Sequence, residues 1–255
     1  VLNRGGDRAR WAAAFRAKRA AAVLVLFGGA FDAAVDHPGG LPADADVLLT
    51  ERAPTMRTHG GQIAFPGGGR DPGDDYPVGT ALREAREETG LAAAGVRVLG
   101  SLPTFPVPSG FEVTPVLGHW HTASEVGVVN AETARVTRVN MRELLAPENR
   151  FQVRRSIAGA TAYKGPAFLY DDMLIWGFTG GLIAAISEAA GWDVPWDTDD
   201  VRPLEQMIEQ TGNRQVSGFA AEEQLVAERI AAEQAAAEQN AAERIAAEQP
   251  DAPAG

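Results

Sequence analysis

Cysteine is absent from the 255 residues of this chain. Disulfide bridges, zinc sites built on thiolates and a cysteine nucleophile are therefore excluded. Long apolar runs are missing too, because the runs at residues 20–27 and 173–186 are shorter than the ~20 residues of a membrane-spanning helix. Residues 1–19 are rich in arginine and alanine without a long apolar stretch, so no signal peptide is expected there. These absences predict a soluble, cytoplasmic protein that does not enter a membrane.

An excess of positive charge is also lacking, since the formal net charge is -11 at pH 7. Residues 198–255 hold 12 acidic and 4 basic side chains, whereas residues 1–197 hold 22 acidic and 19 basic ones. The acidity is thus concentrated near the C-terminus. Neither part is typical of a nucleic-acid-binding surface, so no nucleic-acid partner is expected.

Residues 198–255 form an acidic tail rich in alanine, glutamate and glutamine. A glutamate recurs every five residues from Glu228 to Glu248. A step of five residues turns by about 140° around an α-helix, so the few large side chains build no continuous apolar stripe. We expect a tail that is helical or disordered, with a coiled coil as the alternative.

Residues 1–197 hold apolar runs typical of strands together with a few segments typical of helices, which predicts one α+β domain arranged as an α/β/α sandwich. The helices are expected at residues 1–20, 78–89 and 179–190, the second ending at Gly90. Apolar runs bounded by glycine, proline or polar residues predict strands at residues 22–27, 47–50, 62–65, 96–99, 112–120, 136–139 and 167–175.

The helix at residues 78–89 carries an unusual set of charges. Glu84, Glu87 and Glu88 share one helix face, where like charges oppose helix formation by a few tenths of a kcal/mol per pair. Arg83 can relieve Glu87, but Glu84 and Glu88 still face each other. Such a pair is explained if a divalent cation lies between the carboxylates, and oxygen ligands suit Mg²⁺ or Mn²⁺. The alternative is a solvated helix face with ordinary ion pairs.

Residues 69–91 resemble the Nudix box. That motif reads Gly, five residues, Glu, seven residues, Arg-Glu, apolar, any, Glu-Glu, any, Gly, apolar. The chain matches it at Gly69, at Arg83-Glu84 and throughout the rest of the helix to Leu91. The departure is Asp75, which stands where the box has glutamate. A shorter carboxylate can form the same local contact, or Asp75 can serve as a helix N-cap.

Residues 48–68 are similar to the motif of the coenzyme A pyrophosphatase group of Nudix hydrolases. That motif reads LLTxR, Ser or Ala, three residues, Arg, three residues, Gly, three residues, FPGG, and every specified position is met. The resemblance implies that Arg52 and Arg57 bind phosphate oxygens, although either can instead pair with a nearby acid. Gly67 and Gly68 let the backbone approach the substrate closely.

Together these resemblances imply a Nudix fold with a mixed β-sheet, residues 1–197 being the domain. The implied reaction is metal-dependent hydrolysis of the diphosphate bond of coenzyme A, or of a derivative, to 3′,5′-ADP and 4′-phosphopantetheine. The alternatives are hydrolysis of another nucleoside diphosphate derivative such as ADP-ribose, and a module that binds such a nucleotide without turnover. The partner is a small molecule in each case, and a homodimer is left open.

The resemblance also assigns roles to individual side chains. The general base stays open between a glutamate of the box and a later carboxylate such as Glu112, Glu125 or Glu132. The assigned catalytic residues are Arg83, Glu84, Glu87 and Glu88, and the assigned ligands of Mg²⁺ or Mn²⁺ are Glu84, Glu87 and Glu88.

Overall fold

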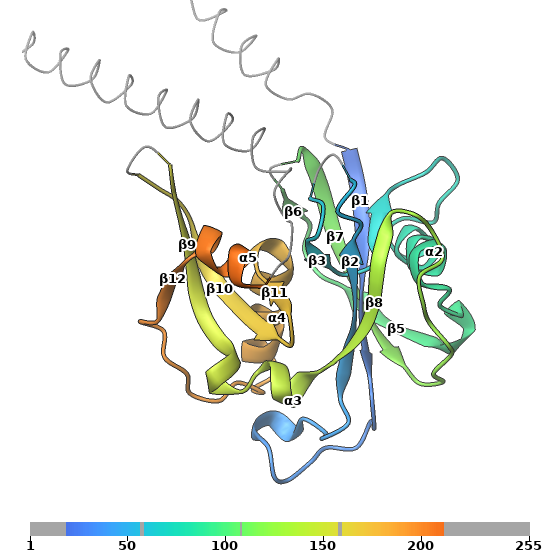
Figure 1. Ribbon diagram of the computed structural model, residues 1–255. Coiled ribbons are helices and arrows are strands. Elements are labelled where there is room, and N and C mark those ends of the chain that lie inside the picture. The colour runs from blue at the N-terminus through green and yellow to red at the C-terminus, as the bar shows by residue number, and fades with distance from the viewer. Residues whose placement is uncertain (1–18, 57–58, 108, 158–159, 212–255) are drawn as a thin grey trace, which may run out of the picture.

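The computed structural model describes residues 19–56, 59–107, 109–157 and 160–211 (Figure 1). Most of the helix expected over residues 1–20 and most of the tail lie outside these ranges; the last two residues of that helix, Arg19 and Ala20, belong instead to a strand. Within the described residues, no helix is both long enough and apolar enough to cross a membrane.

The larger sheet is built around β1 (Arg19–Gly28), which is parallel to β7 (Phe111–Trp120) and antiparallel to β2 (Asp46–Arg52), so the sheet is mixed. β1 and β2 pair only at Phe27 and Gly28. Beyond that point β4 (Gly67–Gly69) pairs with β1 instead. The remaining strands are β3 (Ile63–Ala64) and β8 (Thr133–Asn140) beside β2, and β5 (Val96–Ser101) and β6 (Phe105–Pro106) beside β7.

Helices cover both faces of this sheet (Figure 1). The side chains of β1 alternate, so Leu24 and Leu26 pack with α2 (Val78–Thr89) while Val25 packs with α4 (Gly177–Ala189). The short helix α3 (Met141–Leu144) follows β8, and 3₁₀ turns lie at Pro38–Gly40, Ala93–Gly95 and Pro147–Asn149. The predicted α+β architecture with a mixed sheet between helices is confirmed.

Helix α2 has the predicted limits. It buries Ala81 and Ala85 against the sheet, and it ends where Gly90 adopts a left-handed conformation with φ of 74°. The Gly90 N–H donates to the carbonyl of Arg86, as a helix-terminating glycine does. The predicted helix at residues 179–190 is likewise present as α4, within the usual uncertainty of helix ends.

A smaller sheet of four strands lies on the α4 side of the larger one, in the order β11-β10-β9-β12 (Figure 1). The single strand expected at residues 167–175 is wrong, because β10 (Ala160–Tyr170) and β11 (Met173–Ile175) form a hairpin. Tyr170 pairs with Met173, and Asp171 makes the turn with φ of 52°, a conformation that aspartate tolerates. Strand β9 (Arg150–Ile157) has no counterpart among the predicted strands.

The folded unit continues beyond residue 198, where the tail is expected to begin. β12 (Val201–Pro203) pairs in parallel with β9, and α5 (Leu204–Gln210) follows it. Leu204 and Met207 are buried in a cluster with Phe151 and Val153 of β9. The expected boundary therefore falls inside the fold. The acidic composition of the segment gave no indication that Leu204 and Met207 are buried.

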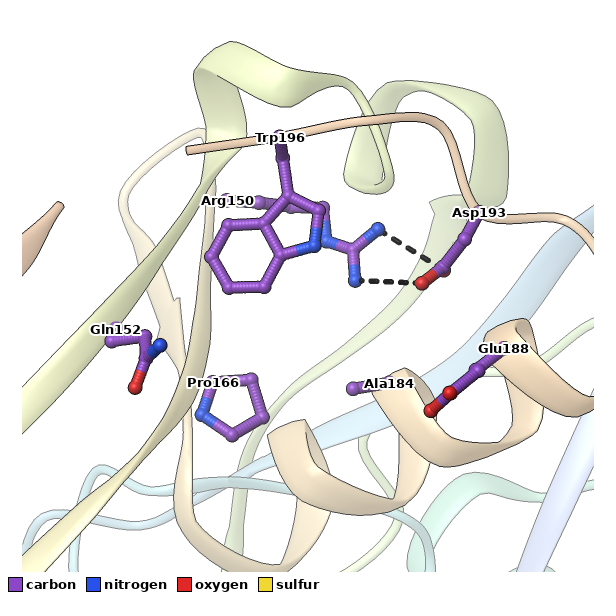
Figure 2. Close-up of a pocket in the computed structure, with 7 residues that line it drawn as sticks. All are labelled: Arg150, Gln152, Pro166, Ala184, Glu188, Asp193 and Trp196. Atoms are coloured by element: carbon purple, nitrogen blue, oxygen red, sulfur yellow. Dashed lines mark hydrogen bonds and ion pairs between the residues drawn. The ribbon is translucent and has the colours of Figure 1, made fainter. Parts of the chain in front are cut away.

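A buried arginine fastens this C-terminal segment to the smaller sheet (Figure 2). Arg150 is 3% exposed, and its guanidinium donates to Asp193 at 3.1 and 3.4 Å. The rings of Phe168 and Trp196 lie over the guanidinium at 5.3 and 4.8 Å from its carbon. Gln152 adds two bonds to the same segment, to the carbonyls of Thr198 and Asp200. Arg150, Gln152, Asp193 and Trp196 are among the residues that line a pocket of about 330 Å³ between β9, β10 and α4.

This arrangement predicts a large loss of stability when Asp193 is replaced by alanine, because Arg150 is left buried without its counter-charge. Removing one partner of a buried pair costs ~3 to 5 kcal/mol, and the partial exposure of Asp193 places the effect at the lower end. The double variant Arg150→Met/Asp193→Leu should recover most of it. Urea unfolding measures the stability of both variants. A free energy of unfolding of Asp193→Ala within about 0.5 kcal/mol of wild type would contradict this role of the Arg150–Asp193 ion pair.

Candidate active site

The first feature of the site is the way in which α2 presents its glutamates to β4. The Glu88 side chain is buried, the residue being 8% exposed, and its Oε2 accepts a hydrogen bond of 3.2 Å from the Gly67 N–H. The Glu84 carboxylate lies against Gly68, where a Cβ would come 2.5 Å from its Cδ. Glu87 is half exposed and turns toward Arg83. The structure therefore brings Glu84 and Glu88 to the glycine strand and leaves Glu87 outside that pair.

Burial controls the electrostatics of these two glutamates. Burial raises the pKa of Glu88 to about 7, with the Gly67 N–H and Arg52 opposing that rise and Glu84 adding to it. Burial also raises the pKa of Glu84, against the lowering effect of Arg83. Neighbouring groups only partly offset the effect of burial on these two carboxylates. Carboxylate oxygens are hard donors, and a divalent cation beside them would favour their ionised forms.

No group of three or more histidine, aspartate or glutamate side chains within the described part of the chain is arranged to hold a metal ion. The donor chemistry of Glu84 and Glu88 nevertheless fits Mg²⁺ or Mn²⁺, since both offer carboxylate oxygens, Glu88 from a buried and Glu84 from a partly buried position. Glu87, the third predicted ligand, is ion-paired with Arg83 at 3.2 Å instead of joining them.

Arg83 connects the helix to the loop and strand before it. Its Nη2 donates to the Gly69 carbonyl at 2.9 Å, and its Nη1 lies 3.0 Å from Glu84 and 3.2 Å from Glu87. Its Nε and Nη2 form a two-pronged contact with Asp74 at 3.1 and 2.9 Å. One guanidinium thus orients two of the predicted catalytic carboxylates relative to β4.

Arg52 reaches the same face of the sheet from β2. Leu48 of the same strand packs with α2, and strand alternation puts residue 52 on that side too. The charge of Arg52 acts on Glu88, and among the described residues none accepts a hydrogen bond from its buried Nε. Its backbone is held by Gln62 and Gly61 at 3.0 and 2.9 Å. Arg57, the second predicted phosphate-binding arginine, lies outside the described residues.

The glycines predicted to approach a substrate are in close contact with the protein itself. A Cβ on Gly67 would lie 2.5 Å from the carbonyl oxygen of Ala22 in β1, and a Cβ on Gly68 would overlap the Glu84 carboxylate. The backbone of β1 therefore requires glycine at position 67, whereas at position 68 a Cβ would displace the Glu84 carboxylate. Their contact with substrate stays a prediction.

Comparison with known proteins gives this geometry a family. The model of the NUDIX domain matches residues 32–157. The "Uncharacterized Nudix hydrolase NudL" of Photorhabdus laumondii is 35% identical over 142 residues, which cover 56% of this chain and 75% of that protein. The chain belongs to the Nudix hydrolase family. It is accordingly a diphosphatase-type hydrolase, and nucleoside diphosphate derivatives are its class of substrate.

Two further likenesses accompany this one. The protein of the same name from Klebsiella pneumoniae (strain ATCC 700721) is 35% identical over 156 residues, covering 57% of this chain and 75% of that protein. Among solved structures, a Nudix hydrolase from M. smegmatis, RenU, is 28% identical, covers 49% of this chain and 73% of its own, and has a TM-score of 0.38.

One residue of the Nudix site is not evident from the sequence. Asp75 occupies the glutamate position of the box, but the carboxylate that binds Arg83 belongs to Asp74. Asp74 also accepts from the Thr80 hydroxyl at 2.8 Å and from the Asp71 N–H at 2.9 Å, and Arg83 holds its pKa well below the usual range. The N-cap interpretation of Asp75 is wrong, because Pro77 occupies that position without a side-chain cap.

Replacing Asp74 by alanine should lower kcat by ~10- to 100-fold, the usual effect of losing a residue that orients a ligand-bearing group. The cause is the freed guanidinium of Arg83, which no longer fixes Glu84. Steady-state kinetics on a nucleoside diphosphate substrate measure the effect. Asp75→Ala is the matched control and should stay within about twofold of wild type, so equal losses in the two variants would contradict the assignment.

The two glycines of β4 should respond differently to alanine. Gly68→Ala pushes the flexible end of Glu84 aside, so kcat should fall by ~100-fold with little change in stability. Gly67→Ala meets backbone instead, so the free energy of unfolding should drop by about 1 to 3 kcal/mol. Gly100→Ala, which meets nothing within 4 Å, is the control for both measurements. An active Gly68→Ala enzyme would show that the Glu84 position is unimportant.

Proposed function

We propose that the chain hydrolyses the diphosphate bond of coenzyme A or of one of its derivatives, with Mg²⁺ or Mn²⁺ as cofactor. Water adds to one phosphorus atom, the P–O bond to the bridging oxygen breaks, and the products are 3′,5′-ADP and 4′-phosphopantetheine or its acyl form. The observation that carries the proposal is the complete motif at residues 48–68, whose Arg52 acts electrostatically on Glu88 of α2.

The residues of α2 would hold the cation. Glu84 and Glu88 supply the carboxylate oxygens, while the Gly67 N–H and Arg83 keep these side chains in place. A bound divalent cation neutralises phosphate charge and lowers the pKa of the attacking water. Glu87, paired with Arg83, would act with these ligands from the half-exposed side of the helix.

Arginine side chains would bind the phosphates. Arg52 offers a planar fork of donors, and its buried Nε is free of protein acceptors among the described residues. Coenzyme A carries a 3′-phosphate as well as its diphosphate, which gives two arginines in one motif separate phosphates to bind. Arg52 and Arg57 are proposed for these roles.

Of the loop carboxylates considered as a general base, Glu132 has the best support. Its charge contributes to the raised pKa of Glu88, so it lies within electrostatic reach of the site. Its backbone carbonyl accepts a hydrogen bond of 2.7 Å from the N–H of Ala53, the neighbour of Arg52. A base carried on this loop would act close to Glu88.

The test is incubation of the full chain with free coenzyme A and either Mg²⁺ or Mn²⁺, followed by chromatographic identification of the products. The expected result is 3′,5′-ADP and 4′-phosphopantetheine, and a loss of at least ~100-fold in kcat for Glu88→Gln. Calorimetry should show that Glu88→Gln still binds coenzyme A, which separates catalysis from binding.

Other outcomes would select other functions. Intact coenzyme A after long incubation with both metals, together with cleavage of ADP-ribose in a parallel reaction, would replace the substrate. Binding of coenzyme A without turnover by either protein would indicate a module that only recognises nucleotides. An unchanged kcat in Glu88→Gln would remove Glu88 from the site.

A further inference from the structure

The C-terminal end of α2 is covered by the loop of residues 126–132, called here the bridging loop. The last carbonyls of a helix lack partners within the helix. Here the Gly127 N–H donates to the Thr89 carbonyl at 2.9 Å, the Val129 N–H to that of Glu88 at 3.4 Å, and the Asn130 side-chain amide to that of Glu87 at 3.1 Å. The backbone of both neighbouring glutamates is therefore tied to one loop.

The same loop is tied to the arginine strand. The Asn130 Oδ1 accepts from the N–H groups of Glu132 and Thr133 at 3.0 and 3.1 Å. Thr133 pairs with Arg52 across the β2–β8 ladder, where the register shifts between Glu51 and Arg52.

Asn130 thus connects two parts of the site with a single side chain. Its amide accepts two hydrogen bonds and donates one, which only a carboxamide does at this length. The three partners also fix the orientation of the amide, because two N–H groups face one atom and a carbonyl faces the other. Aspartate would keep both accepted bonds but lose the donor, and it would place negative charge at the negative end of the helix dipole.

We propose that Asn130 is a positioning residue that sets the distance between the glutamates of α2 and Arg52, without touching substrate. The inference rests on the proposed function insofar as those groups act on a diphosphate. Its separate content is mechanical: the amide donor of Asn130 holds the helix end to the loop that continues into the partner strand of Arg52.

Two variants of the full chain isolate this contact. Asn130→Asp removes the link to the Glu87 carbonyl and adds a negative charge there, whereas Asn130→Ala removes the link and the two bonds that Oδ1 accepts within the loop. Asn140 gives a matched control, since its Oδ1 accepts from the N–H groups of Arg142 and Glu143 and its Nδ2 donates to the Ala43 carbonyl, at the start of α3. Asn140→Asp therefore loses the same donor at another place in the fold.

The measurements are kcat and KM for coenzyme A, the Mg²⁺ concentration at half-maximal thermal stabilisation of the substrate-free protein, and urea unfolding. Asn130→Asp should lower kcat by ~10-fold and raise the half-maximal Mg²⁺ concentration by a similar factor, as losses of orienting partners do. Asn140→Asp should change neither. Equal effects in the two aspartate variants, or a loss of activity matched by the unfolded fraction, would overturn the inference.

The two proposals fail in different ways. If wild type leaves coenzyme A intact, the proposed substrate is wrong, and the Mg²⁺ titration alone decides on Asn130. If wild type cleaves coenzyme A and Asn130→Asp keeps its kcat and Mg²⁺ response, only the positioning role is lost. A wild-type protein that Mg²⁺ does not stabilise would overturn the positioning role as well.

Discussion

The close approach of a glycine strand to a row of carboxylates is the constraint on which the site depends. β4 leaves no room for a Cβ against β1 at Gly67, nor against Glu84 at Gly68. This contact brings α2 so close to the sheet that Glu88 is buried and its carboxylate takes the Gly67 N–H as a partner. Burial in turn raises the pKa of Glu88 to about 7. Backbone geometry thus makes the ionised form of Glu88 unfavourable in the substrate-free protein, and a cation beside it would favour that form.

The positively charged and N–H partners that the protein supplies are not shared equally among the three glutamates. Arg83 is within ion-pair distance of Glu84 and Glu87 through its Nη1, whereas its Nη2 is hydrogen-bonded to Asp74. Glu88 receives one backbone N–H and the more general influence of Arg52. The strongest remaining demand for positive charge is therefore at Glu88, beside the glycines. A cation at Glu88 would supply that charge, and Arg83 would serve to hold the carboxylates in position.

Local signals predicted the parts of the fold that depend on local interactions. The helix at residues 78–89 and its end at Gly90 follow from periodicity and from a left-handed glycine, and the box spacing located Arg83. The role of Asp74 was not predicted, because the turn geometry of the loop decides whether residue 74 or residue 75 reaches Arg83, and motif spacing contains no information on that geometry. The hairpin turn at Asp171 was not predicted, because the apolar residues on both sides of it resemble one continuous strand. The boundary near residue 198 was hidden by acidic composition, while the deciding fact is burial of Leu204 against a distant strand.

The site joins elements that are far apart in the sequence, and this limits how independently they can vary. The glutamates belong to α2 and Arg52 belongs to β2. Asn130 of the bridging loop bonds to the backbone of α2 and to that of Thr133, the residue of β8 that pairs with Arg52. A change in that loop moves the proposed metal ligands and the proposed phosphate-binding arginine together. Recognition of a substrate and its hydrolysis are then coupled through backbone hydrogen bonds.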